Sequence, residues 1–426
     1  MVKRRVELIA LCLVVLVYTG FLPVYTRNPF SCVLQEQSIK SISGTVISSP
    51  VKTSSGKSYS VELDVNEASS DVSHALCSGS VMLYVPASDI EALYPGKLFS
   101  SSRSASNSSY PLIEEGCHIS ADVVYSGFVD KDSLSIISGN VAKHAFSVKC
   151  VTECVWQKSF SYIRAFLRLQ LKRLLFAWGA TGGLLLALLC GAREYTDLAV
   201  SEAFRKAGLS HILALSGMHL SLFSGLSEKT AGKLVGKRFS PYLSLGAAIL
   251  FVWFAGLSPS LLRALICMCI GFFASVFGFK TTPLKTLSLA FVIHLVISPE
   301  DVGSIAFMLS YLALVGVYAG DKFLKNPLCR VLPPSIATTF AVSIGAQVLT
   351  LPLTIAISGS LIPAAVLASV VVSPVASFFV TSGIVSILFV LIMPFLSLPL
   401  GSILLVLYNV MSYIVRFFAG IPCIRI

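Results

Sequence analysis

A short apolar stretch in the middle of the chain carries an unusual concentration of polar side chains. Residues 208–222 read GLSHILALSGMHLSL, and the polar groups at its centre are Ser210, His211, Ser216 and His219. Polar side chains are costly in hydrocarbon, so within a bilayer they face a partner or a water-filled path. On a helix, Ser216 and His219 share a face at spacing i, i+3. These residues could line a path, or they could join one helix to another, with Gly217 allowing close approach.

The same residue types permit two other functions. An intramembrane serine hydrolase would use Ser216 as nucleophile and His219 or His294 as base, although no orienting carboxylate or oxyanion hole is obvious in the sequence. A secondary transporter of another anionic solute would also contain broken, polar helices. His294 stands alone on an apolar run, so we expect it to serve packing rather than function.

The composition is that of a membrane protein. Hydrophobic residues make up 55% of the 426 positions, and the mean hydropathy is +0.82. Only 12% of the residues are charged, which is too few to coat a soluble surface of this size. We therefore predict a polytopic α-helical membrane protein.

The net charge of +11 is unevenly distributed. Residues 38–150 hold eight basic and eleven acidic residues, whereas residues 151–426 hold twenty basic and eight acidic ones. Cytoplasmic loops of membrane proteins collect Lys and Arg whatever the cargo. The basic excess of the membrane part is therefore weak evidence for nucleic-acid binding.

The first 150 residues divide into an anchor and a β region. Residues 1–29 contain Lys3-Arg4-Arg5 before an apolar run, which predicts an uncleaved transmembrane anchor with a cytoplasmic N-terminus. Residues 30–150 alternate in character like short strands, and we predict a small β-barrel outside the cytoplasm. The expected strands cover residues 41–47, 59–65, 81–86 and 122–129, with a hairpin turn at 53–57 between the first two.

Five cysteines lie in or beside this region, so at most two disulfides can form among them. The spacing Cys150-x-x-x-Cys154 has no second ligand pair, and we expect no metal site and no cofactor. The chain also contains no nucleotide-binding P-loop, so an ATP-driven motor would be a separate protein.

Residues 151–178 predict an amphipathic interfacial helix. Its basic residues recur every fourth position, at Arg164, Arg168 and Lys172, opposite apolar residues such as Phe160 and Leu167. The helix could lie in the lipid headgroup layer. Alternatively, its cations could form a basic entrance that gathers phosphates.

Residues 179–426 contain the predicted membrane spans. Apolar runs at 174–191, 242–257, 261–279, 287–297 and 302–320 alternate between basic and uncharged or acidic flanks, and three or four further spans follow residue 336, broken by prolines. Residues 209–226 have basic residues on both sides, which predicts a broken or re-entrant segment that enters and leaves on the cytoplasmic face.

The sequence of residues 204–219, FRKAGLSHILALSGMH, closely resembles the signature of the ComEC competence family. Later motifs resemble those of the same family and occur in the same order. They are Arg263-Ala264 after Ser258-Pro259, FMLSY at 307–311, QVLTLPL at 347–353, and Pro374. One departure is Ser369, which stands where the family usually has Asn and therefore offers a hydroxyl in place of a side-chain amide. The resemblance is dense over residues 180–390.

The resemblance implies a bacterial inner-membrane channel that imports single-stranded DNA during natural transformation. It implies an OB-like fold for the extracytoplasmic β domain, and separate polypeptides for a DNA receptor, a nuclease and a cytoplasmic motor. Related fused chains carry a metallo-β-lactamase-like domain, whose His-x-His-x-Asp-His string we do not find, so we expect no enzyme activity. The resemblance is also compatible with a channel formed by an oligomer of this chain.

A DNA path must shield a polyanion from lipid without binding it tightly. We therefore expect it to be lined by hydroxyls, amides and imidazoles, with few cations. Arg263 begins its predicted helix, so it could extend to the outer interface or contact phosphates near the mouth. The residues expected to line the path are Ser210, His211, Ser216, His219, Arg263, Ser310, Tyr311, Gln347 and Thr350.

Overall fold

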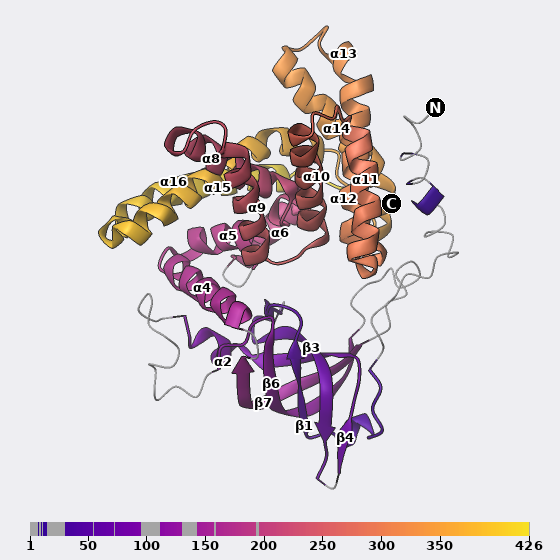
Figure 1. Ribbon diagram of the computed structural model, residues 1–426, viewed down its shortest axis with the longest axis vertical. Helices are drawn as coiled ribbons and strands as arrows, with labels where there is room; N and C mark the ends of the chain where they lie inside the picture. The colour runs from indigo at the N-terminus through magenta and orange to yellow at the C-terminus, as the bar shows by residue number, and fades with distance from the viewer. Residues whose placement is uncertain are drawn as a thin grey trace. The chain divides into compact units, whose positions relative to one another are not determined.

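The computed structural model describes residues 7, 10, 12–14, 30–53, 55–71, 73–94, 111–129, 143–156, 159–192 and 196–425. The predicted anchor at residues 1–29 lies almost wholly outside these residues. The chain divides into two compact units (Figure 1). One is a β unit of residues 26–186 and 192–195, and the other is a helical unit of residues 1–25, 187–191 and 196–426.

The β unit contains a mixed seven-stranded sheet. Its strands are β1 (Ser41–Val46), β2 (Val51–Lys52), β3 (Ser58–Ser69), β4 (His74–Leu76), β5 (Ser80–Pro86), β6 (Cys117–Val129) and β7 (Lys143–Trp156). The strand order is β1-β6-β7-β5-β3-β2, and β1 pairs with β3 as well as with β6. All pairings are antiparallel except that of β5 with β7.

The four predicted strands are confirmed, with longer bounds for β3 and β6. In β1 every second residue is buried, as the alternating sequence predicts for a strand with one face on a core. β7 was not predicted, and it extends to Trp156, past the expected boundary at residue 150. The following helix, α4, accordingly covers Ser159–Phe176.

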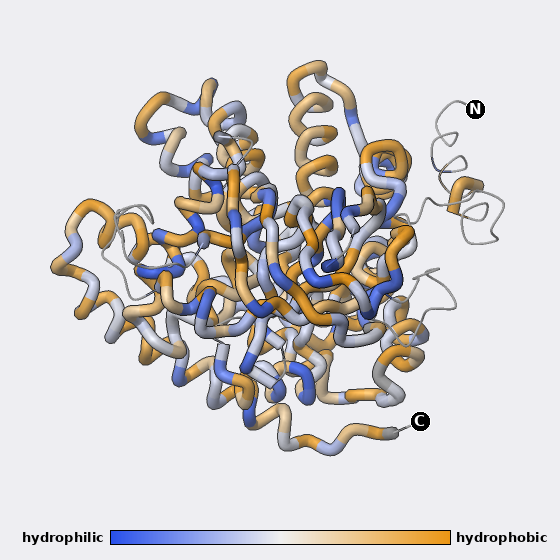
Figure 2. Tube along the Cα trace, turned by 90° about the horizontal axis from the view of Figure 1, so that it is seen from below, coloured by the Kyte–Doolittle hydropathy of each residue, from blue (hydrophilic) through white to orange (hydrophobic). Residues whose placement is uncertain are grey.

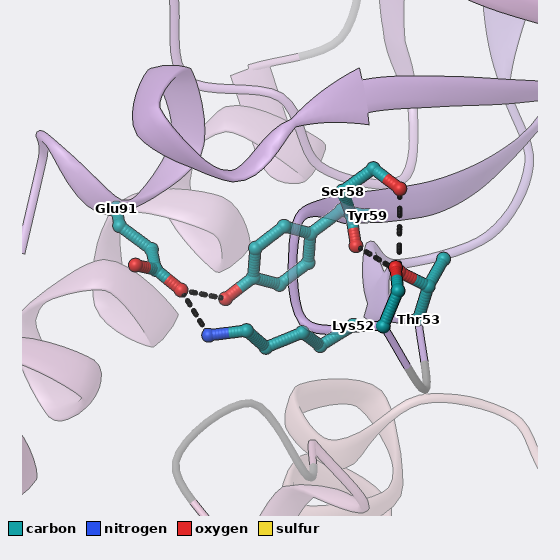
Figure 3. Close-up of polar contacts among 6 residues, drawn as sticks. Lys52, Thr53, Ser58, Tyr59 and Glu91 are labelled. Atoms are coloured by element: carbon teal, nitrogen blue, oxygen red, sulfur yellow. Dashed lines mark hydrogen bonds and ion pairs between the residues drawn. The ribbon is translucent and has the colours of Figure 1, made fainter.

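The predicted turn at 53–57, of which the structure describes residues 53 and 55–57, joins β2 to β3 rather than β1 to β3. Thr53 Oγ1 donates to the Ser58 carbonyl at 2.8 Å, which fixes the turn (Figure 3). Beside it, Glu91 of the short helix α2 (Ala87–Glu91) accepts hydrogen bonds from Tyr59 at 2.9 Å and from Lys52 at 2.5 Å. Cys32 and Cys77 form a disulfide in this unit.

The helical unit contains long apolar helices, and Figure 2 shows orange, hydrophobic residues recurring along the coiled parts of the chain. Those long and apolar enough to cross a membrane number five among the described residues: α10 (Pro259–Val276), α12 (Ile305–Phe323), α14 (Pro334–Ser358), α15 (Ala365–Ile392) and α16 (Ser397–Ala419). This arrangement fits the predicted polytopic membrane protein. Shorter apolar helices of this unit are α9 (Ser240–Ala255) and α11 (Pro283–Ile297), and a third, α5 (Gly179–Cys190), has residues 179–186 in the β unit and residues 187–190 in the helical unit. Other helices here are α6 (Leu198–Lys206), α7 (Ser210–Leu213), α8 (Gly217–Leu234) and α13 (Lys325–Leu328).

The segment at 209–226 is broken, as predicted. α7 ends at Leu213, the backbone is extended at Ala214 and Ser216, and α8 begins at Gly217. The downstream prolines behave differently from expectation, because Pro352 and Pro374 lie inside α14 and α15. Helices surrounded by other helices and lipid tolerate proline, since neighbouring groups satisfy the freed carbonyls.

Glycines bring α12 and α14 into backbone contact. A Cβ on Gly316 would lie 2.3 Å from the Gly345 carbonyl oxygen, and a Cβ on Gly345 would lie 2.2 Å from the Gly316 oxygen. Small residues at such positions let membrane helices pack closely. α12 also carries Ser310 and Tyr311, and α14 carries Gln347 and Thr350, so this contact fixes the relative positions of four predicted site residues.

Candidate functional site

The N-terminus of α8 forms the first part of the candidate site. Ser216 is the N-cap residue, and its backbone N–H donates to His219 Nδ1 at 3.2 Å. The Ser216 hydroxyl also lies 3.2 Å from the same ring nitrogen. The prediction placed both residues on one helical face, but Ser216 is extended and His219 folds back to cap the helix.

This hydrogen bond determines the state of the imidazole. Because Nδ1 accepts a backbone N–H, it carries no proton, and Nε2 is then the protonated nitrogen of the neutral ring. His219 is only 1% exposed, and its Nε2 has no hydrogen-bond partner within the described structure. The site therefore contains a buried N–H donor that is free to bind an acceptor.

Arg263, on the first turns of α10, forms the second part. Its side chain is buried, it donates to the Ser310 carbonyl, and its guanidinium lies 5.8 Å from the centre of the Tyr311 ring. Its Nε is buried without a partner among the described residues. The ion pairs described in the helical unit involve Lys206, His294 and Lys325 rather than Arg263.

Tyr311 belongs to a chain of polar contacts that reaches an acidic residue. His294 of α11 is fully buried, with Nδ1 3.3 Å from the Tyr311 hydroxyl and Nε2 3.2 Å from Asp301 Oδ2. Since an ionised carboxylate only accepts, Nε2 donates to Asp301, and Nδ1 of a neutral ring accepts from Tyr311. Asp301 lies in the 3₁₀ helix Pro299–Gly303, before α12.

Gly217 connects the two parts. A Cβ at this position would lie 3.2 Å from the Ala264 Cβ and 3.8 Å from Arg263 Nη2. The opening turn of α8 therefore packs against the first turns of α10. The structure thus brings together five of the predicted path residues, namely Ser216, His219, Arg263, Ser310 and Tyr311.

The remaining predicted path residues lie elsewhere in the helical unit. Ser210 and His211 are exposed on α7. Gln347 donates to the Ser369 hydroxyl of α15 at 3.4 Å, so the serine that replaces the family's usual Asn still makes a polar contact. Thr350 donates to the Ala346 carbonyl of its own helix at 3.0 Å.

Three residues of the polar cluster were missed or misjudged from sequence. His294 was assigned to packing, and Asp301 and Ser260, whose hydroxyl accepts from Ser310 at 3.2 Å, were not considered. A signal was present for His294, because an ionisable residue inside an apolar span is by default a functional candidate. Its partners depend on how α11 and α12 pack, which the sequence does not reveal.

The three cations of the expected basic entrance are bound to partners inside the β unit. Arg164 donates to Glu115 at 2.9 Å, Arg168 donates to the Ser49 hydroxyl at 2.7 Å, and Lys172 lies 3.4 Å from Glu114. Burial alone would raise the pKa of the Glu114 carboxyl, but the charges of Arg168 and Lys172 outweigh it and lower the pKa to about 2. These cations are thus neutralised within the β unit rather than presented to a ligand.

The cluster presents hydrogen-bond donors, so it is suited to bind a ligand that carries hydrogen-bond acceptors. His219 and Arg263 offer buried N–H groups, and the only carboxylate in the described network, Asp301, is engaged by His294. Among the residues described, no three His, Cys, Asp or Glu side chains gather as metal ligands do. The fold and site define a polytopic membrane protein with a buried, donor-rich site between its helices.

The comparison with protein families agrees with this class. A family model described as "Competence protein" matches residues 188–426, more than half of the chain. The chain therefore belongs to the competence protein (ComEC) family. The matched region contains every residue of the cluster.

A curated relative and the solved structures complete the comparison. The chain is 24% identical over 212 residues to ComE operon protein 3 of Bacillus subtilis (strain 168). The match covers 49% of this chain and 26% of the relative, so the chain spans about a quarter of that protein's length. No solved structure matches the chain.

Proposed function

We propose that this chain forms an inner-membrane channel for single-stranded DNA during natural transformation, and that Arg263 and His219 contact the passing phosphates. The proposal extends the competence and DNA-uptake role that the family supports. The observation that carries it is the buried Arg263, which has an unpartnered Nε beside a fixed aromatic ring. A guanidinium with free N–H groups binds phosphate oxygens well.

The site is suited to transient rather than tight binding. One arginine and one neutral imidazole supply a single positive charge, so a phosphate group would be held by few contacts. Conduction requires sites that are favourable enough to admit the cargo and weak enough to release it. A pore lined by many cations would instead retain a polyanion.

Uptake of labelled DNA by a competent host that lacks its own channel tests the proposal. Arg263→Gln removes the charge, and Arg416→Gln is the matched control, because Arg416 is exposed near the end of α16. Loss of one charge-assisted contact, worth about 1.5–3 kcal/mol, predicts at least a tenfold decrease in uptake for Arg263→Gln. Arg416→Gln should keep uptake near that of the wild type at equal membrane levels.

The outcome separates DNA from other anions. If the wild-type chain imports no DNA although it is folded and a motor is supplied, the same donors point to a secondary transporter of a smaller anionic solute. The serine hydrolase is not favoured, because His219 Nδ1 already accepts the Ser216 backbone N–H and cannot also serve as base for the Ser216 hydroxyl.

The β unit is, in this proposal, an extracytoplasmic OB-like domain. Its support is a mixed sheet in which β1 pairs with both β6 and β3, and in which β5 and β7 are parallel. A DNA receptor, a nuclease and a cytoplasmic ATP-driven motor would be separate partners. Because the matched relative is much longer than the matched region, these assignments rest on this proposal alone.

A further inference from the structure

Helix α4 presents an apolar surface to its surroundings. Of its residues, those that are exposed are Ser159, Phe160, Ile163, Leu167 and Phe176. Phe160, Ile163 and Leu167 are 70%, 47% and 39% exposed and follow one another at spacings of three and four. They therefore form one stripe along the outer face of the helix.

All four basic side chains of α4 point away from this stripe and contact residues of the β unit. Arg164, Arg168 and Lys172 contact Glu115, Ser49 and Glu114 of the same unit, and Arg173 Nε donates to the Leu93 carbonyl at 3.0 Å. The carboxylate that receives most of this charge, Glu114, is itself buried. No charged side chain of α4 is thus exposed.

This orientation is the reverse of a helix on a water-exposed surface. Such a helix buries its apolar face and leaves Lys and Arg in water. Burying cations is costly unless they are paired, and Glu114 and Glu115 supply that pairing here. An exposed apolar stripe on a helix without exposed charge favours contact with something less polar than water.

We propose that the α4 stripe of Phe160, Ile163 and Leu167 contacts the acyl region of the bilayer and holds the β unit against the membrane by apolar contact. The inference is independent of whether the chain conducts DNA. It differs from both interpretations of the sequence, a helix in the lipid headgroup layer and a basic entrance that gathers phosphates, because the cations of α4 contact partners inside the β unit.

Lipid is the occupant that fits the stripe best. Among the residues that the structure describes, five helices can cross a membrane, and the apolar helix α5 begins three residues after α4 ends. Trp156 and Tyr162 pack together at the start of α4, and such residues favour membrane interfaces. Three side chains cover far less than the roughly 800 Å² per partner that stable protein interfaces bury.

Photo-crosslinking of the full chain in lipid nanodiscs tests the contact. The photoreactive residue p-benzoylphenylalanine replaces Ile163 or Leu167, and the adducts are identified by mass spectrometry. Leu76 is the matched control, because it is apolar and 79% exposed but lies on β4, at the opposite end of the β unit from α4 (Figure 1). We expect several-fold more lipid adduct at Ile163 and Leu167 than at Leu76.

Two results would overturn the proposal. One is crosslinking of Ile163 and Leu167 mainly to a second copy of the chain or to another protein, and the other is a lipid yield no higher than at Leu76. The dependence of the lipid crosslinking yield on lipid charge provides an independent test. The yield should stay constant when phosphatidylcholine is replaced by a mixture rich in phosphatidylglycerol, whereas a strong rise would show that the cations face the headgroups.

Discussion

At the scale of single residues, a chain of polar contacts explains how Arg263, which has no carboxylate partner among the described residues, is held in place. Asp301 Oδ2 lies 3.2 Å from His294 Nε2, the Tyr311 hydroxyl lies 3.3 Å from His294 Nδ1, and the Tyr311 ring lies beside the guanidinium. The negative charge is therefore two side chains away from Arg263. It can orient the site without occupying the N–H groups that would bind an anion.

This arrangement predicts coupled effects of substitution. Tyr311→Phe keeps the ring but removes the hydroxyl, so it should lower DNA uptake less than Tyr311→Ala does. Asp301→Asn acts through His294 and Tyr311, so it should have little further effect in the Tyr311→Phe background. Uptake by the single and double variants, measured as a double-mutant cycle, checks this. Fully additive effects would show that Asp301 does not act through Tyr311.

Glu114 gives a prediction of pH dependence. Its pKa is about 2 in the folded chain, below the ordinary value of 4.5, so its stabilising effect is present above about pH 4.5 and is lost as the pH falls toward 2. Glu114→Gln should remove this acid-dependent step. It should also lower stability at pH 7 by roughly 3 kcal/mol, because Arg168 and Lys172 stay buried with one partner fewer.

Thermal unfolding followed by Trp156 fluorescence measures both effects, since Trp156 packs on Tyr162 of α4. The other two tryptophans, Trp178 and Trp253, are replaced by Phe for this purpose. Glu67→Gln serves as a control, because Glu67 is an exposed carboxylate of the same unit. A midpoint that falls equally with acid in the Glu114→Gln chain would contradict the assignment.

At the scale of elements, the contact between α12 and α14 limits how these helices can move. Gly316 and Gly345 meet backbone to backbone, with no side chain between them that could change rotamer. The two helices are therefore expected to move as a pair. Any widening of a path must then come from helices that lack such contacts.

Substitution at this contact tests the pairing. A Cβ at Gly345 would meet the Gly316 backbone oxygen at 2.2 Å, so Gly345→Ala should destabilise the helical unit by about 1–3 kcal/mol, the usual range for overpacking. Gly271→Ala on α10 is the control, since its Cβ would meet nothing within 4 Å. Thermal stability in detergent should fall for the first variant and stay unchanged for the second.

At the scale of the whole molecule, the break between α7 and α8 leaves the topology of this segment to be measured. Basic residues flank it on both sides, which predicts that Glu202 and Lys233 face the cytoplasm together. Both residues are exposed, so cysteines introduced there can be labelled. In a background that lacks the membrane cysteines, an impermeant maleimide should label both in inverted vesicles and neither in intact cells. Labelling of one site from each side would contradict a re-entrant segment.

Much of the architecture follows from local patterns in the sequence. Alternation predicted the first strands, because side chains alternate between faces, and apolar runs predicted the long helices. β7 was missed because lysine, cysteine and glutamate interrupt its alternation. The orientation of α4 was not predictable in the same way. Periodicity shows that Arg164 and Arg168 share a face, but only the position of Glu114 in the fold shows that this face points inward.

The ion cluster beneath α4 also decides where the chain can be divided. A fragment that ends at Trp156 would keep Glu114 without Arg168 and Lys172, which leaves a carboxylate in an apolar site. A fragment that continues to Phe176 would keep the cluster but expose Phe160, Ile163 and Leu167 to water. Neither fragment is suited to plain buffer, so preparation of the β unit by itself calls for the longer fragment with detergent or lipid present.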